Sequence, residues 1–210
     1  MKNQLSSLQI DALQEIANIG GNNAATCLSQ LVGSPVQVIA PTMSLVPISN
    51  FINEVALKSD QMAVVAKMDV LGGTPGNMLL FLNYKEASHL VDLLLGRKKR
   101  YDEEEMDLVE LQTIKQVSII LAASYLYALS KFLQMTIVPG DPIVRTITMG
   151  EAVEHILTPM SQMLQNGFFI RNEFLESYSK IEGHLLFLPY QQALETILVI
   201  VNEKAGKGRR

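Results

Sequence analysis

The chain has 210 residues, long enough for one large domain or two small ones. Hydrophobic residues make up 48% of it and charged residues 18%, which provides for a sizeable core and excludes a disordered chain. The net charge of −4 and the pI near 5.4 argue against nucleic acid as a partner. The single cysteine, Cys27, excludes a disulfide framework and a cysteine metal cage.

No stretch of the sequence predicts a secreted or membrane protein. The chain start, MKNQLSSLQIDALQE, has no apolar signal-peptide core. The longest mostly apolar run, residues 117–129, is interrupted by two serines and is shorter than the roughly 18–20 residues that a membrane-spanning helix needs. Together with the cysteine usage, this predicts a soluble protein of the cytoplasm without a membrane partner.

The chain opens with a helical stripe of apolar and small side chains, which predicts a long helix from Leu5 to Leu31. Gly20 and Gly21 weaken that helix by roughly 1 kcal/mol each relative to alanine, which indicates either close packing or a locally loosened turn. The residues Gly33-Ser34-Pro35 end the helix. Strands are expected over 61–70 and 77–83, separated by the glycine-rich turn 72–76, and a helix over 84–95.

The second half is expected to begin with another long helix. The predicted elements are a helix over 105–133, extended segments over 135–138 and 143–148, a helix over 151–163, strands over 167–175 and 181–188, and a last helix over 191–202. The tail, residues 204–210, is expected to be disordered.

The two halves resemble each other in sequence. Residues 78–96 and 184–202 each read as an apolar strand, then Asn-Tyr or Pro-Tyr, then an amphipathic helix. The opening helix also recurs about 100 residues later, and Pro41 and Pro142 close the two copies. A period of this length excludes a solenoid unit.

We therefore expect one domain, 1–210, made of two repeats at about 5–96 and 105–203 that pack about a pseudo-twofold axis. The junction, residues 96–105, is expected to be a solvated loop rather than a binding patch. Because two fused halves already satisfy the dyad, the expected state is a monomer.

A polar stripe lies on one face of the first helix. Asp11, Glu15, Asn18 and Asn22 are spaced four, three and four residues apart. One interpretation is a plain solvated face. The other is a site, in which the Asn18 carboxamide donates and accepts hydrogen bonds at once and holds a water, while Glu15 acts as a base, a metal ligand or a partner for a cation. No histidine or second carboxylate stands at metal-ligand spacing around Glu15, so no metal is expected on this chain.

The pattern Asp-x3-Glu-x2-Asn-x22-Pro, filled by Asp11, Glu15, Asn18 and Pro41, resembles the signature of the CheC family. The runs NIGGNNAAT, residues 18–26, and SYLYALSKF, residues 124–132, strengthen the resemblance, which covers nearly the whole chain. Members of this family are phosphatases of the chemotaxis response regulator CheY, related to CheX and FliY.

The resemblance implies an α/β (α+β) fold with internal pseudo-symmetry, in which long paired helices pack on a mostly antiparallel sheet. It implies that the substrate is a protein, namely a CheY-like receiver that carries a phosphoaspartate and its own Mg²⁺. It also implies that this chain binds no cofactor. Asn18 would orient the attacking water and Glu15 would contact a lysine of the receiver. Asp11 and Asn22 would support them, and Pro41 would set the entry to the following strand. These roles agree with phosphoryl transfer, which needs mostly positioning and charge stabilisation.

The second half departs from this pattern. Gln116 and Ile119 stand where a second Glu-x2-Asn pair would fall, and Pro142 is retained. A glutamine cannot form the salt bridge of a glutamate and an isoleucine cannot orient a water, so we expect a catalytically dead second site. Its apolar stripe, with Ala122, Ala123 and Tyr127, is either core or a partner-binding patch.

An alternative to the phosphatase is a non-catalytic chemotaxis adaptor that binds a receiver domain or a CheD-type deamidase. Other motifs carry no chemistry: the run GGTPGN, residues 72–77, lacks the lysine of a phosphate loop and predicts a turn, His89, His155 and His184 are scattered, and Cys27 is expected in the core.

Overall fold

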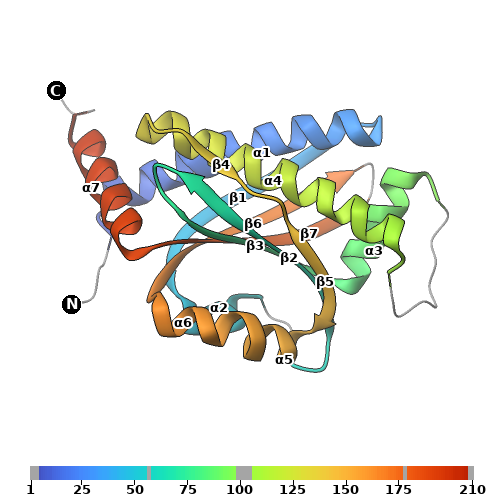
Figure 1. Ribbon diagram of the computed structural model, residues 1–210. Helices are drawn as coiled ribbons and strands as arrows, with labels where there is room; N and C mark the ends of the chain where they lie inside the picture. Colours follow the sequence, from blue (N-terminus) through green and yellow to red (C-terminus); the bar gives the residue numbers. More distant parts are fainter. Residues whose placement is uncertain (1–4, 56–57, 98–105, 177–178, 208–210) are drawn as a thin grey trace.

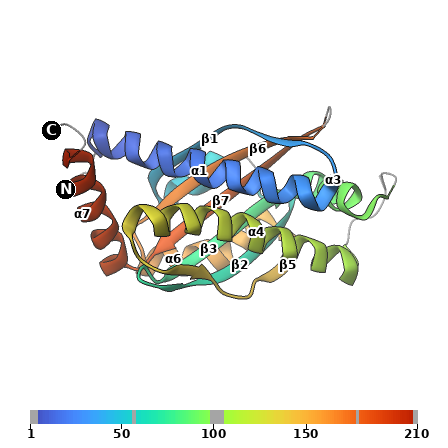
Figure 2. The same ribbon diagram turned by 90° about the horizontal axis from the view of Figure 1, so that it is seen from above.

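Two helices of 26 residues each, α1 (Ser7–Val32) and α4 (Leu108–Leu133), lie side by side across one face of a sheet (Figure 1 and Figure 2). The structure is a computed structural model that describes residues 5–55, 58–97, 106–176 and 179–207. Each long helix begins at a capping box, formed by Ser6 with Gln9 and by Asp107 with Glu110. Both predicted helices are confirmed.

The two long helices also end in the same way. Gly33 and Gln134, the residues after the last turns, both adopt the left-handed conformation, with φ of 75° and 58°. In each case the backbone N–H bonds back to a serine carbonyl four residues earlier, Ser29 or Ser130, which satisfies a carbonyl that the helix end leaves free.

The strands within the described residues form one seven-stranded antiparallel sheet in the order β1-β6-β7-β3-β2-β4, and β5 also pairs with β2. Their bounds are β1 Val36–Pro47, β2 Met62–Gly72, β3 Gly76–Asn83, β4 Ile137–Pro139, β5 Ile143–Thr148, β6 Asn166–Glu176 and β7 Ser179–Pro189. The predicted class, long helices on an antiparallel sheet, is confirmed. β1 has no counterpart among the elements predicted from periodicity, because a bulge shifts the alternation of its side chains midway.

The sheet interlocks the two halves of the chain. β1 from the first half pairs with β6 of the second, and β5 of the second half pairs with β2 of the first. The element order is also shared: a long helix, one or two strands, a short helical segment, two strands and a helix. The internal duplication within one domain stays a prediction from the sequence.

Apolar residues fill both faces of the sheet. One core cluster lies under α1, α4, α3 (Tyr84–Leu95) and α7 (Gln191–Lys207). The other lies under α2 (Ile48–Val55), α5 (Met149–Ala152) and α6 (Thr158–Met163) on the opposite face (Figure 1). In place of the single helix predicted over 151–163, the structure has α5 and α6, two short helices joined by a π-helical segment, Val153–Leu157. Pro159 occupies the first turn of α6, where a missing N–H is tolerated.

The C-terminal boundary expected from the sequence is wrong for residues 204–207. α7 continues to Lys207, and the Lys204 ammonium donates a hydrogen bond to the Phe132 carbonyl near the end of α4. This docking gives the last turns a partner that sequence periodicity does not reveal. Residues 208–210 lie outside the described residues.

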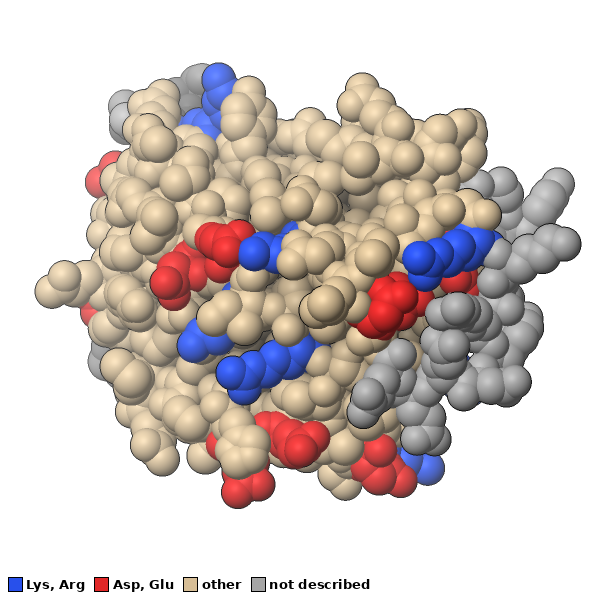
Figure 3. Space-filling view, turned by 45° about the vertical axis from the view of Figure 1, so that its right-hand side comes forward, with Lys and Arg blue, Asp and Glu red and all other residues tan. Residues whose placement is uncertain are grey.

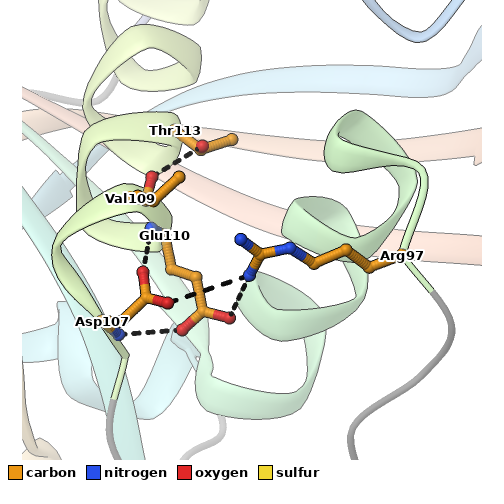
Figure 4. Close-up of polar contacts among 5 residues, drawn as sticks. All are labelled: Arg97, Asp107, Val109, Glu110 and Thr113. Atoms are coloured by element: carbon orange, nitrogen blue, oxygen red, sulfur yellow. Dashed lines mark hydrogen bonds and ion pairs between the residues drawn. The ribbon is translucent and has the colours of Figure 1, made fainter.

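A polar cluster fastens the start of α4 to the end of α3 (Figure 4). The Arg97 guanidinium lies 3.3 Å from the Glu110 carboxylate and 3.8 Å from that of Asp107. The Glu110 carboxylate also accepts the Asp107 N–H at 2.9 Å. These contacts hold together the two ends of the junction. Of the solvated loop expected over 96–105, residues 98–105 lie outside the described residues.

By length and composition alone, α4 is apolar enough to cross a membrane. In this fold 56% of its most apolar 18-residue stretch is buried, and α4 packs against α1 and the sheet. This burial fits the core helix of a soluble protein.

Candidate functional site

The polar stripe predicted on the first helix lies on the outer face of α1. Asp11, Glu15, Asn18 and Asn22 are all exposed. The opposite face, with Leu13, Ile16, Ala17 and Gly20, is buried against the rest of the molecule. The structure therefore brings the four predicted side chains onto one accessible surface.

Gln14, the residue before Glu15, holds the Asn18 side chain. Its Nε2 donates to Asn18 Oδ1 at 3.2 Å and to the backbone carbonyl of Pro41 at 2.6 Å. Nε2 carries two hydrogens, so one donor group serves both acceptors. The carboxamide of Asn18 is thereby tied to a segment 23 positions further along the chain.

Pro41 lies inside β1 and not before a strand, which corrects the role expected for it. The pairing of β1 with β6 shifts between Ile39 and Thr42, so that Ala40 and Pro41 stand opposite the single residue Asn172. Such a bulge suits proline, which has no N–H to give to the ladder.

Two glycines let distant elements approach α1 beside the site. A Cβ at Gly20 would lie 2.4 Å from the Tyr125 ring, and one at Gly21 would lie 2.9 Å from Pro41 Cγ. The Tyr125 hydroxyl, from α4, donates to the side-chain oxygen of Asn172. Burial raises the pKa of Tyr125, so the hydroxyl keeps its proton and remains a donor. The site is thus backed by buried contacts from α4 and β6.

The corresponding positions on α4 are differently occupied. Gln116 is exposed, Ile119 is half-buried and Pro142 is buried. Lys115 stands where α1 has Gln14, and its ammonium lies 2.7 Å from the Asp141 carboxylate. In this stripe Ala122 is buried, Ala123 is half-buried and Tyr127 is 53% exposed, so it is neither wholly core nor wholly surface.

Among the described residues, no group of three or more His, Cys, Asp or Glu side chains could hold a metal ion. On the face drawn in Figure 3, acidic and basic side chains alternate in small groups without one extended basic patch in its described part.

Three other residues singled out in the sequence have ordinary environments. Cys27 is half-buried rather than fully in the core. His155 is exposed, and His184 is buried against the Phe169 ring, where burial lowers its pKa.

Sequence reasoning missed Gln14, Tyr125 and Asn172. Gln14 lies between the apolar stripe and Glu15, and Tyr125 lies within a run that carries the family resemblance, but neither position indicates which distant atom it contacts. Asn172 stands between Arg171 and Glu173 in a predicted strand, so its polarity does not reveal that the fold leaves it only 1% exposed.

Comparison with known proteins agrees with the expected resemblance. No protein-family model matches the chain. The CheY-P phosphatase CheC of Bacillus subtilis is 22% identical over 202 residues, which cover 94% of this chain and 95% of that protein. The flagellar motor switch phosphatase FliY of B. subtilis is 22% identical over 160 residues, which cover 76% of this chain and 41% of that protein.

The fold itself is found in a solved structure. The X-ray crystal structure of Thermotoga maritima FliY matches with a TM-score of 0.76 and 20% identity, over 95% of this chain and 98% of that one. The similarity to CheC and FliY proteins predicted from the sequence is therefore confirmed, and the fold is shared with FliY.

Proposed function

We propose that this protein hydrolyses the phosphoaspartate of a CheY-like receiver domain, with Glu15 and Asn18 of α1 as the working pair. The similarity to the CheY-P phosphatase CheC supports the substrate class, and the similarity to the flagellar motor switch phosphatase FliY supports phosphatase activity. The observation that carries the assignment to α1 is the exposed Asn18 carboxamide, held by Gln14 next to an exposed Glu15.

The chemistry needs little from the protein beyond positioning. The receiver brings the phosphoryl group and its own Mg²⁺ as part of the substrate. Asn18 enters the receiver's site and orients a water, whose oxygen attacks phosphorus as the bond to the aspartate oxygen breaks, giving inorganic phosphate and a free carboxylate. An acyl phosphate is already reactive, so an aligned water suffices. Glu15 pairs with a lysine of the receiver and fixes the docking.

The second half supplies no such pair. Gln116 carries no charge and Ile119 no hydrogen-bonding group, so the α4 surface is inactive in this proposal. We propose further that the protein is monomeric and cytoplasmic and has one site for the receiver. A CheD-type deamidase would be an additional partner.

The decisive test is the dephosphorylation rate of a phosphorylated CheY-like receiver with wild type and with Asn18→Ala. Loss of one preorganised hydrogen-bonding group is expected to lower the rate by about 10²–10³, as for a single oxyanion-hole donor. Gln116→Ala, at the α4 position that corresponds to Glu15, is the control and should retain the wild-type rate. Circular dichroism is the control for correct folding of both variants.

The adaptor alternative predicts a different result. If Asn18→Ala binds the receiver and dephosphorylates it as wild type does, Asn18 is not catalytic and the phosphatase proposal fails. Receiver binding by wild type without any acceleration of dephosphorylation would establish the adaptor instead.

A further inference from the structure

We propose that Gln14 is the residue that positions Asn18 for catalysis, and that it does so by bridging Asn18 to the Pro41 carbonyl. This inference rests on the proposed function and adds a third side chain to it. Gln14 does not reach the receiver's reacting atoms in this scheme, so it is a positioning residue and not a catalytic one.

The geometry gives the bridge a direction. Gln14 Nε2 donates to Pro41 O at 2.6 Å and to Asn18 Oδ1 at 3.2 Å. Because Oδ1 of Asn18 accepts from Gln14, its NH₂ group is turned away from that donor and can face the substrate. Oδ1 keeps a second lone pair for a water. The bridge thus selects one of the two orientations of the carboxamide.

The far end of the bridge is fixed by packing. Pro41 is buried, its ring fills the space left by the absent side chain of Gly21, and it lies in the β1 bulge opposite Asn172. A carbonyl in a bulge is released from the regular ladder and can accept from a side chain. Gln14 itself is half-buried; its hydrogen bond to Pro41 is part-buried, whereas its hydrogen bond to Asn18 is exposed.

The corresponding positions on α4 support a joint role for Gln14 and Asn18. Lys115 takes the place of Gln14 and binds Asp141, while Ile119 takes the place of Asn18. Lys115 thus reaches the segment before Pro142 through a side-chain carboxylate and not through a backbone carbonyl, and position 119 offers it no carboxamide to hold. Gln14 and Asn18 therefore occur together on α1 and are both absent from α4.

The test compares Gln14→Met and Gln14→Lys with wild type. Methionine has a similar length and helix propensity but no donor, whereas lysine keeps donors for both oxygens. We expect Gln14→Met to lower kcat by about three- to tenfold with KM for the phosphorylated receiver unchanged, because docking through Glu15 is intact. Gln14→Lys should retain most of the wild-type kcat. A purely structural role would instead lower the melting temperature of Gln14→Met.

A second readout does not depend on activity. The side-chain amide of Asn18, observed by ¹⁵N relaxation, should be more mobile in Gln14→Met than in wild type and restrained again in Gln14→Lys. Wild-type kcat and an equally restrained Asn18 in Gln14→Met would overturn the inference while Asn18→Ala remained inactive. If the wild-type protein does not accelerate dephosphorylation, the proposed function fails, and the relaxation measurement alone decides whether Gln14 holds Asn18.

Discussion

Gly20 shows at the scale of a single residue how α1 is fitted to its surroundings. The sequence left open whether Gly20 and Gly21 mark close packing or a loosened turn. α1 is continuous from Ser7 to Val32, and the Tyr125 ring occupies the space where a Gly20 side chain would stand. Close packing is therefore the correct interpretation, and it brings Tyr125 next to the turn that carries Asn18.

Gly20→Ala is expected to destabilise the protein. In an open helix this change would stabilise by about 1 kcal/mol, but here a Cβ would lie 2.4 Å from a buried ring. The free energy of unfolding should fall by about 1–3 kcal/mol in urea denaturation, because the ring or the helix must move. Asn22→Ala, an exposed position on the same helix, should change it by less than about 0.5 kcal/mol. A Gly20→Ala variant as stable as wild type would show that the packing is looser than described.

At the scale of elements, each long helix is joined to the following strand by the same kind of hydrogen bond, from a strand N–H to a serine hydroxyl of the helix. The Ser29 hydroxyl accepts the Val36 N–H at 2.8 Å at the start of β1. The Ser130 hydroxyl accepts the Ile137 N–H at 3.1 Å at the start of β4. Both serines lie in the last turn of their helix. The contact fixes where each strand starts, and through β1 it fixes the segment that carries Pro41.

Ser130→Ala should remove this connection on the α4 side. Ile137 is buried, so its N–H would lose an acceptor without gaining water, and the free energy of unfolding should fall by about 1–3 kcal/mol. Ser29→Ala should act in the same direction. Ser161→Ala, an exposed serine that bonds only within α6, is the control. Hydrogen exchange gives an independent check, since an Ile137 amide as protected as in wild type would contradict the role of Ser130.

At the scale of the whole molecule, the two long helices lie together on one face of an interlocked sheet, yet only α1 carries the polar pair (Figure 2). The capping boxes, the left-handed ends and the serine contacts occur at corresponding positions of both helices. We infer from these shared features that α4 keeps the backbone arrangement of a site like that on α1. It carries other side chains in place of the polar pair.

Restoring those side chains should restore activity. Lys115→Gln, Gln116→Glu and Ile119→Asn together are expected to raise dephosphorylation by at least roughly tenfold when added to Asn18→Ala. Gln116→Glu with Ile119→Asn alone should gain less, because Lys115 would still bind Asp141 and leave the new asparagine unheld. The measurement is the receiver dephosphorylation rate of the two combinations in the Asn18→Ala background. A folded triple variant without any gain would mean that α4 does not keep the backbone arrangement of a site.

The sequence by itself determined the features that depend on neighbours along the chain. The repeat of apolar side chains located the long helices and most strands, and the spacing of Asp11, Glu15 and Asn18 placed them on one face. Periodicity and motif spacing are local properties, so they can be read without knowing where the chain folds back.

Only the tertiary structure decided what surrounds those residues. The bond from Gln14 to Pro41, the Tyr125 ring against Gly20, the bulge in β1 and the half-burial of Ile119 each join segments that are distant in sequence. Their partners are set by sheet register and helix packing, which no local pattern encodes. The polar stripe was thus readable from the sequence, whereas the contact that orients Asn18 depends on how α1 and β1 meet in the fold.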